Sequence, residues 1–153
     1  MIGITINIEG MERLKEAMQK APEMTVNEMS FAVRKGALIY KSQALKEAPV
    51  NKQPGGGNLR QNIKERFTNK LRAEVTSFAP YSLYVEGGTK PHIIKAVNKK
   101  VLANKRMGQI FGKIVHHPGT RANPYMARAV EKTQAQITQL FQTAIKNVFN
   151  SLK

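Results

Sequence analysis

The sequence predicts an α+β fold, in which helices cover one face of a mainly antiparallel sheet of short strands. Isoleucines alternate at the N-terminus, two long stretches repeat apolar residues at helical spacing, and several short β-branched runs lie between them. The expected order is an N-terminal strand, two helices, short strands and a long C-terminal helix. A length of 153 residues suits one domain, so we expect a single domain over 1–153.

The N-terminal part of the chain is expected to form the first strand and both early helices. Isoleucine occupies every second position over residues 2–8, which is typical of a half-buried strand. Apolar residues at helical spacing over 11–20 predict a short helix. A longer helix is expected to start at a capping box formed by Thr25 and Glu28, and to end before Pro49.

This longer helix carries two apolar stripes. The first consists of Val26, Met29, Val33, Ala37, Tyr40 and Ala44. The second consists of Phe31, Leu38 and Leu45. Because the combined apolar surface is wide, we expect the helix to pack on more than one side.

The middle of the chain reads as a loop followed by a hairpin. Residues 50–57 are rich in glycine, and Asn58 is expected to cap the short helical turn that follows. Strands are predicted around 64–68 and 71–78, with Asn69-Lys70 as the turn between them, since asparagine tolerates turn geometry.

Residues 80–117 contain several short candidate elements. A compact aromatic segment is expected at 80–86, and a last strand at 113–116. The short strand candidates between them are Ile93-Ile94, Val101-Leu102 and Ile110-Phe111. The basic region at about 89–112 is either a hairpin or a mobile loop that orders only on assembly.

A long helix is predicted at the C-terminus. Asn123 suits the N-cap and Pro124 the first helical position. One apolar stripe then consists of Met126, Val130, Ile137, Phe141, Ala144, Val148 and Leu152. A helix over 124–152 would be about 43 Å long, enough to cross the sheet and reach a neighbouring subunit.

The net charge of +15 is unevenly distributed. No acidic residue lies between Glu86 and Glu131, whereas this stretch holds Lys90, Lys95, Lys99, Lys100, Lys105, Arg106, Lys113, Arg121 and Arg128. Such a balance favours contact with nucleic acid, an acidic protein surface or anionic lipid, and the alternative is a surface that only aids solubility.

The composition argues against an enzyme, a metal site and a cofactor. The chain has no cysteine and no aspartate, which removes most zinc, calcium and catalytic-triad arrangements. His116 and His117 would point to opposite faces of a strand, and we expect them to form hydrogen bonds at the strand end. The glycine-rich segment 54–58 lacks the Gly-Lys-Ser/Thr of a phosphate-binding loop. A small nuclease or toxin that uses His116 or His117 is a further alternative.

No apolar run is long enough for a membrane span, and the N-terminus shows no secretory pattern. We therefore expect no membrane partner, and the absence of cysteine suits synthesis in a reducing cytoplasm.

Three segments of the chain form an ordered series. The first is Ala48-Pro49-Val50 followed by Gly57-Asn58-Leu59-Arg60-Gln61-Asn62-Ile63. The second is Pro80-Tyr81-Ser82-Leu83-Tyr84-Val85-Glu86-Gly87-Gly88-Thr89, and the third is His117-Pro118-Gly119-Thr120-Arg121-Ala122-Asn123-Pro124-Tyr125-Met126. Together they resemble the tail-component family of siphophages, whose members are neck, head–tail connector or tail-completion proteins. The loop at 51–57 departs from that family's usual Asp-Thr-Gly, and the basic segment 90–113 follows no strict family pattern.

The resemblance implies a virion structural protein of a tailed phage or prophage, assembled in the host cytoplasm. It would form an oligomeric ring at the head–tail junction, between the connector and the tail tube. Its partners would be copies of itself and the connector, head-closure and tail-terminator or tail-tube proteins. A stand-alone nucleic-acid-binding protein is the alternative.

The resemblance and the charge pattern together predict site residues of two kinds, the first from the family motifs and the second from the basic stretch. Those expected to fix the fold and the contacts between neighbours are Asn58, Leu59, Arg60, Tyr81, Tyr84, Glu86, Gly88, Pro118, Gly119, Pro124 and Tyr125. Those expected to face DNA or an acidic partner are Lys95, Lys99, Lys100, Lys105, Arg106 and Lys113.

Overall fold

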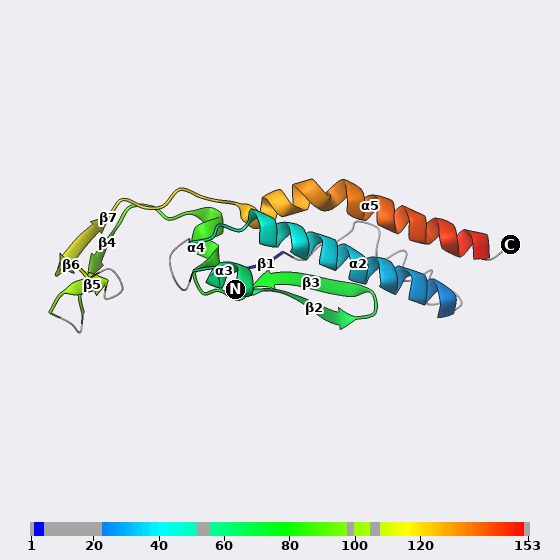
Figure 1. Cartoon of the computed structure of the whole chain (residues 1–153), viewed down its shortest axis with the longest axis horizontal. Coiled ribbons are helices and arrows are strands. Elements are labelled where there is room, and N and C mark those ends of the chain that lie inside the picture. Colours follow the sequence, from blue (N-terminus) through cyan, green and yellow to red (C-terminus); the bar gives the residue numbers. More distant parts are fainter. Residues whose placement is uncertain (1, 5–22, 52–55, 98–99, 105–107, 152–153) are drawn as a thin grey trace. The chain divides into compact units, whose positions relative to one another are not determined.

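A computed structural model describes residues 2–4, 23–51, 56–97, 100–104 and 108–151, and confirms the α+β class. The chain divides into two compact units (Figure 1). The first, here called the body, comprises 1–82 and 124–153, and the second, the ladder unit, comprises 83–123. The helix predicted at 11–20 and the strand positions at 5–8 lie outside the described residues.

The body contains an antiparallel sheet and two long helices. Its described elements are β1 (Ile2–Ile4), α2 (Glu23–Glu47), α3 (Asn58–Gln61), β2 (Ile63–Asn69), β3 (Arg72–Ser77) and α5 (Tyr125–Ser151). The strand order is β1-β3-β2, so β3 is central. The predicted turn between β2 and β3 is confirmed, because the Leu71 N–H donates to Asn69 Oδ1 at 2.9 Å.

Three predicted helix starts differ from the structure. Helix α2 begins at Glu23, so Thr25 lies inside its first turn and is not the cap. The capping position of α3 is Gly57, with φ of 86°, and Asn58 is the first helical residue. A left-handed backbone is easy for glycine, which explains why Gly57 takes this position. Helix α5 begins one residue later than predicted, and the Pro124 carbonyl accepts a hydrogen bond from the Arg128 N–H at 3.0 Å.

Helix α2 lies between α5 and the β2–β3 hairpin (Figure 1). The two long helices run antiparallel, since Glu47 at the end of α2 meets Arg128 near the start of α5. The first predicted stripe is confirmed as the core of α2, with Met29, Val33, Ala37, Tyr40 and Ala44 buried. On α5 the buried residues include Tyr125, Met126, Ala129, Thr133, Ile137 and Ala144. Lys41 forms an ion pair with Glu65 and so joins α2 to β2, and this hydrogen bond lowers the pKa of Glu65.

The second predicted stripe does not pack as expected. Phe31 is 61 % exposed and Leu38 is 50 % exposed. Lys35 Nζ lies 5.8 Å from the centre of the Phe31 ring, a cation–π contact that partly compensates for its exposure. Helix α2 does contact both α5 and the sheet, so it packs on more than one side, but of this stripe only Leu45 is partly buried.

Gly36 in the middle of α2 allows a direct stability test. A Cβ at this position would lie 3.5 Å from Ile137 Cγ2 and 3.8 Å from the Phe141 ring, which is ordinary van der Waals contact. We expect Gly36→Ala to stabilise the body by about 0.5–1 kcal/mol, because alanine has the higher helix propensity and a smaller entropy loss on folding. Urea unfolding measures this gain, and Gly36→Leu should instead destabilise by overpacking. A loss of stability in the alanine variant would contradict the packing described.

The ladder unit consists of short antiparallel pairs. Its elements are α4 (Ser82–Gly87, whose first residue belongs to the body), β4 (His92–Lys95), β5 (Leu102–Asn104), β6 (Gln109–Gly112) and β7 (Ile114–His117). Strand β4 pairs with β7, and β5 pairs with β6. Within the described part of 89–112, residues 92–95, 102–104 and 109–112 form strands. Within the described residues no helix is long and apolar enough to span a membrane.

Candidate assembly site

The second and third motif segments meet in the ladder unit. The Thr89 N–H donates to the Thr120 carbonyl at 2.9 Å, and the Thr120 N–H donates back to the Thr89 carbonyl at 3.1 Å. The Asn123 N–H donates to the Val85 carbonyl at 2.8 Å. These three bonds hold the two ends of the ladder unit together, and we call this region the Gly-Thr crossing.

Both glycines of the crossing are required by the backbone. Gly88 has φ of 71° and Gly119 has φ of 89°, in the left-handed region that favours glycine. A Cβ on Gly88 would lie 2.5 Å from the Thr120 carbonyl oxygen, and one on Gly119 would lie 2.4 Å from the Thr89 carbonyl oxygen. Each glycine therefore makes room for the Gly-Thr segment opposite.

The histidines next to the crossing have structural contacts. The rings of His92 and His117 stack with centroids 4.9 Å apart. Nδ1 of His117 accepts a hydrogen bond from the Gly119 N–H at 3.1 Å, which confirms the expected role at the strand end. His116 lies on the other face of β7 and is exposed. Among the described residues, no three His, Cys, Asp or Glu side chains form a group that could hold a metal ion.

The first motif segment forms hydrogen bonds to the C-terminal end of α2. Arg60 Nε donates to the Ala48 carbonyl at 3.0 Å, and Arg60 Nη2 donates to the Lys46 carbonyl at 3.3 Å. A cation suits this place, because the last carbonyls of a helix lack intrahelical partners and carry partial negative charge. Asn58 Nδ2 donates to the Tyr81 hydroxyl at 3.3 Å, which links the first segment to the second.

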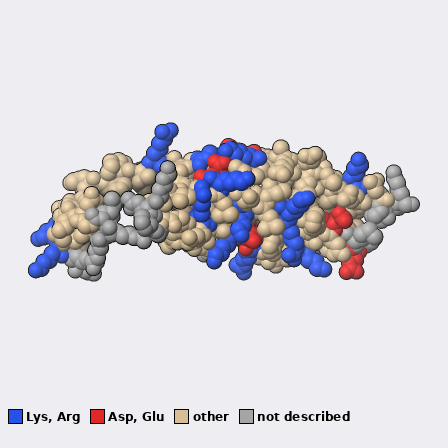
Figure 2. All heavy atoms as spheres, in the orientation of Figure 1, with Lys and Arg blue, Asp and Glu red and all other residues tan. Residues whose placement is uncertain are grey.

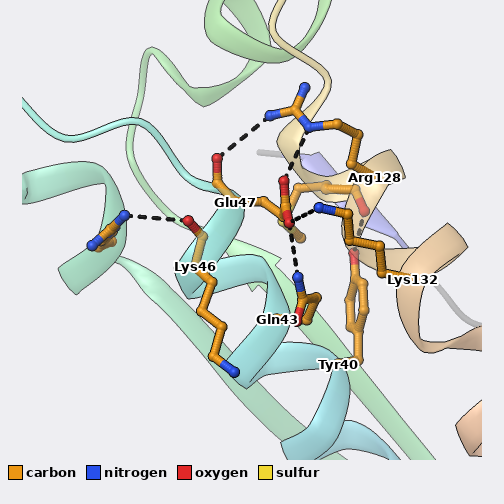
Figure 3. Close-up of polar contacts among 8 residues, drawn as sticks. Tyr40, Gln43, Lys46, Glu47, Arg128 and Lys132 are labelled. Atoms are coloured by element: carbon orange, nitrogen blue, oxygen red, sulfur yellow. Dashed lines mark hydrogen bonds and ion pairs between the residues drawn. The ribbon is translucent and has the colours of Figure 1, made fainter.

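Glu47 is the centre of a charged cluster at the same helix end (Figure 3). Its carboxylate accepts from Arg128 Nε at 3.1 Å, Lys132 Nζ at 2.6 Å and Gln43 Nε2 at 2.8 Å. The hydrogen bonds from Lys132 and then Arg128 lower the pKa of Glu47 from its ordinary value of 4.5 to about 2. The cluster ties the end of α2 to the first turns of α5.

The cluster predicts a specific response to acid. Because the folded-state pKa of Glu47 is depressed, its contribution to stability is complete above pH 4.5 and is lost as the pH falls towards 2. We expect Glu47→Gln to lower the melting temperature at pH 7 and to have little effect near pH 2. Melting temperature measured against pH tests this, with Glu131→Gln, an exposed glutamate of α5, as the control. Parallel pH curves for wild type and Glu47→Gln would contradict the assignment.

The structure places the predicted fold and assembly residues at different depths. Leu59 and Tyr125 are buried and so serve the fold of the body. The exposed members are Asn58, Tyr81, Tyr84, Pro118 and Pro124, and the partly exposed ones are Arg60, Glu86, Gly88 and Gly119.

Of the predicted DNA-facing or partner-facing residues, Lys95, Lys100 and Lys113 are exposed. Lys99, Lys105 and Arg106 lie outside the described residues. The sequence reasoning missed the Glu47 cluster, since 81 residues separate Glu47 from Arg128 and no local pattern connects them.

Comparison with protein families gives one match, over residues 12–88, half of the 153-residue chain. The matching family is described as "Bacteriophage HK97-gp10, putative tail-component". The match includes the first motif segment and the second as far as Gly88, whereas the third lies beyond it. Comparisons with curated proteins and with solved structures give no match. The chain therefore belongs to the HK97-gp10-like family of bacteriophage tail components.

Proposed function

We propose that this protein is a structural subunit of a tailed phage virion, forming a ring at the head–tail junction between the connector and the tail tube. Membership of a tail-component family supports the structural role. One observation supports assembly in particular: no described residue of the ladder unit is buried, although this unit holds many apolar side chains. Such a unit gains stability when another protein covers it.

The body has the properties expected of a subunit that repeats in an assembly. Its helices are fixed to each other by the Glu47 cluster and by a buried seam of small and apolar residues. A rigid subunit that presents one surface to a different surface of the next copy generates a closed ring when the rotation repeats evenly. Neighbours above and below the ring would be connector, head-closure, tail-terminator or tail-tube proteins.

The positive charge suits a position near the DNA path. On the face seen in Figure 2, basic side chains outnumber acidic ones. Exposed lysines such as Lys95, Lys100 and Lys113 attract phosphate without sequence preference, which would let DNA pass along a lumen. The same lysines favour the alternative, a stand-alone nucleic-acid-binding protein.

Electron microscopy of the phage particle tests the proposal. We expect ring-shaped density for this protein at the head–tail junction, and separate heads and tails when the gene carries an early stop codon. Expression of the wild-type protein from a plasmid should restore joined particles. Complete particles without the protein, or its location elsewhere in the virion, would exclude the junction role. The DNA-binding alternative instead predicts absence from the particle and an affinity for DNA that falls steeply with salt.

A further inference from the structure

The β4–β7 pair has an exposed face that combines apolar and basic side chains. Register pairs Ile93 with His116, and Lys95 with Ile114, so all four side chains lie on one face. Ile93 and Ile114 are each 54 % exposed, and His116 and Lys95 are exposed as well. We call these four residues the Ile93–Ile114 face.

This face is unusual for a surface that remains in water. Two β-branched side chains lie diagonally across a two-stranded ladder, and such a ladder alone is only marginally stable. The neighbouring pair β5–β6 also exposes apolar side chains, with Ile110 at 73 % and Phe111 at 50 %. Contiguous exposed apolar side chains with a polar rim mark a site of protein–protein contact.

Charge identifies the kind of partner. Of the chain's 25 Lys and Arg residues, eight lie in the ladder unit together with one of the ten glutamates. The rest of the chain keeps 17 basic and nine acidic residues, so it is also strongly positive. A second copy would bring like charge to this face, which disfavours self-association there. DNA would match the charge but would offer little to cover two isoleucines.

We propose that the Ile93–Ile114 face docks onto a different virion protein, whose contact surface is an apolar patch with acidic residues around it. This inference rests on the proposed structural role in the virion but not on the position at the head–tail junction. The isoleucines fill the apolar patch, while Lys95 on the same face and the exposed Lys113, which precedes Ile114 in the sequence at the end of the ladder, pair with carboxylates at its rim. The charge pairs speed and orient the encounter, and burial of the isoleucines provides most of the affinity.

Site-specific photo-crosslinking in assembled particles tests this. A photoreactive amino acid replaces Ile93 in one set of particles and Ile114 in another, and mass spectrometry identifies the product. We expect products with a different virion protein, at a segment rich in Asp or Glu. Products with another copy of this chain or with DNA, or no product at either position, would overturn the proposal. Phe31, which is 61 % exposed on α2, is the control position and should not give that product.

A charge-reversed variant tests the acidic rim. Lys95→Glu/Lys113→Glu, produced alongside wild-type copies so that particles still form, should lower the Ile93 crosslink about tenfold or more. Exclusion of this folded variant from particles would support the proposal equally. The matched control is Lys64→Glu/Lys70→Glu, which reverses two exposed lysines of the β2–β3 hairpin and should leave the yield unchanged. An unchanged yield of the Ile93 crosslink for Lys95→Glu/Lys113→Glu would contradict the proposal that the partner has an acidic rim.

The two proposals fail in different ways. A crosslink to an acidic virion protein away from the head–tail junction would remove the junction role and keep the docking face. A ring at the junction whose Ile93 contacts only its own copies would keep the junction role and remove the docking face.

Discussion

Gly88→Val and Gly119→Val will each open the ladder unit at the Gly-Thr crossing and leave the body folded. The new side chain would meet backbone atoms at 2.5 Å or less, and backbone cannot move aside as a flexible side chain can. Valine is also strained at a φ of 71° or 89°. We expect a local cost of about 2 kcal/mol or more, enough to break the paired bonds between Thr89 and Thr120.

Hydrogen exchange of individual backbone amides measures this opening. The Thr89, Thr120 and Asn123 amides donate across the crossing and should lose protection in both variants. Amides in the middle of α2 and α5 should keep theirs, and the melting temperature of the body should change little. Under the proposed function, particles carrying either variant should fail to join heads to tails.

Alanine substitutions at two other glycines measure separately the cost of a steric clash and the cost of a strained backbone angle. Gly87 has open space for a Cβ and no positive φ, so Gly87→Ala should be neutral. Gly112 has open space but a φ of 90°, so Gly112→Ala should cost only the backbone strain, about 1 kcal/mol. If Gly88→Val keeps full protection at Thr89 and Thr120, the crossing does not depend on close backbone approach.

Local patterns predicted most of the body. The stripe from Met29 to Ala44 identified the buried side of α2, and Asn69 identified the turn of the hairpin. Both signals depend on residues within a few positions of one another, which a single sequence displays directly. The prediction that Asn58 caps α3 was wrong. The cap depends on the left-handed backbone of Gly57, and the sequence pattern fits Asn58, one residue later, equally well.

Exposure and distant pairing were less predictable. Phe31 and Leu38 have the spacing of a buried stripe, but spacing alone does not reveal whether another element covers them. The resemblance to a phage family identified Gly88 and Gly119 as important positions. Their physical role is to let two Gly-Thr segments approach each other closely, and only the folded structure shows this. The same holds for Glu47, whose cationic partners come from a helix distant in the sequence.

Tyr40→Ala will destabilise the body far more than any surface change. Tyr40 is fully buried where α2 faces α5, and its hydroxyl donates to the Met126 carbonyl at 3.4 Å. Removal of a buried aromatic ring leaves a cavity and costs about 3–5 kcal/mol, a large part of the 5–15 kcal/mol that stabilises a typical domain. Tyr40→Phe keeps the ring and should cost at most about 1 kcal/mol, because the hydrogen bond is long.

Urea unfolding at neutral pH distinguishes these outcomes, with Phe31→Ala as the control for loss of an aromatic ring from the same helix. Phe31 is largely exposed, so that variant should lie within about 0.5 kcal/mol of wild type. Similar losses for Tyr40→Ala and Phe31→Ala would mean that α2 does not pack on α5 as described. The Tyr40 variants also predict a difference in phage assembly. Under the proposed function, a ring subunit whose helices separate cannot hold its neighbours in register. A phage with Tyr40→Ala should then join heads to tails only at low temperature, whereas one with Tyr40→Phe should do so normally.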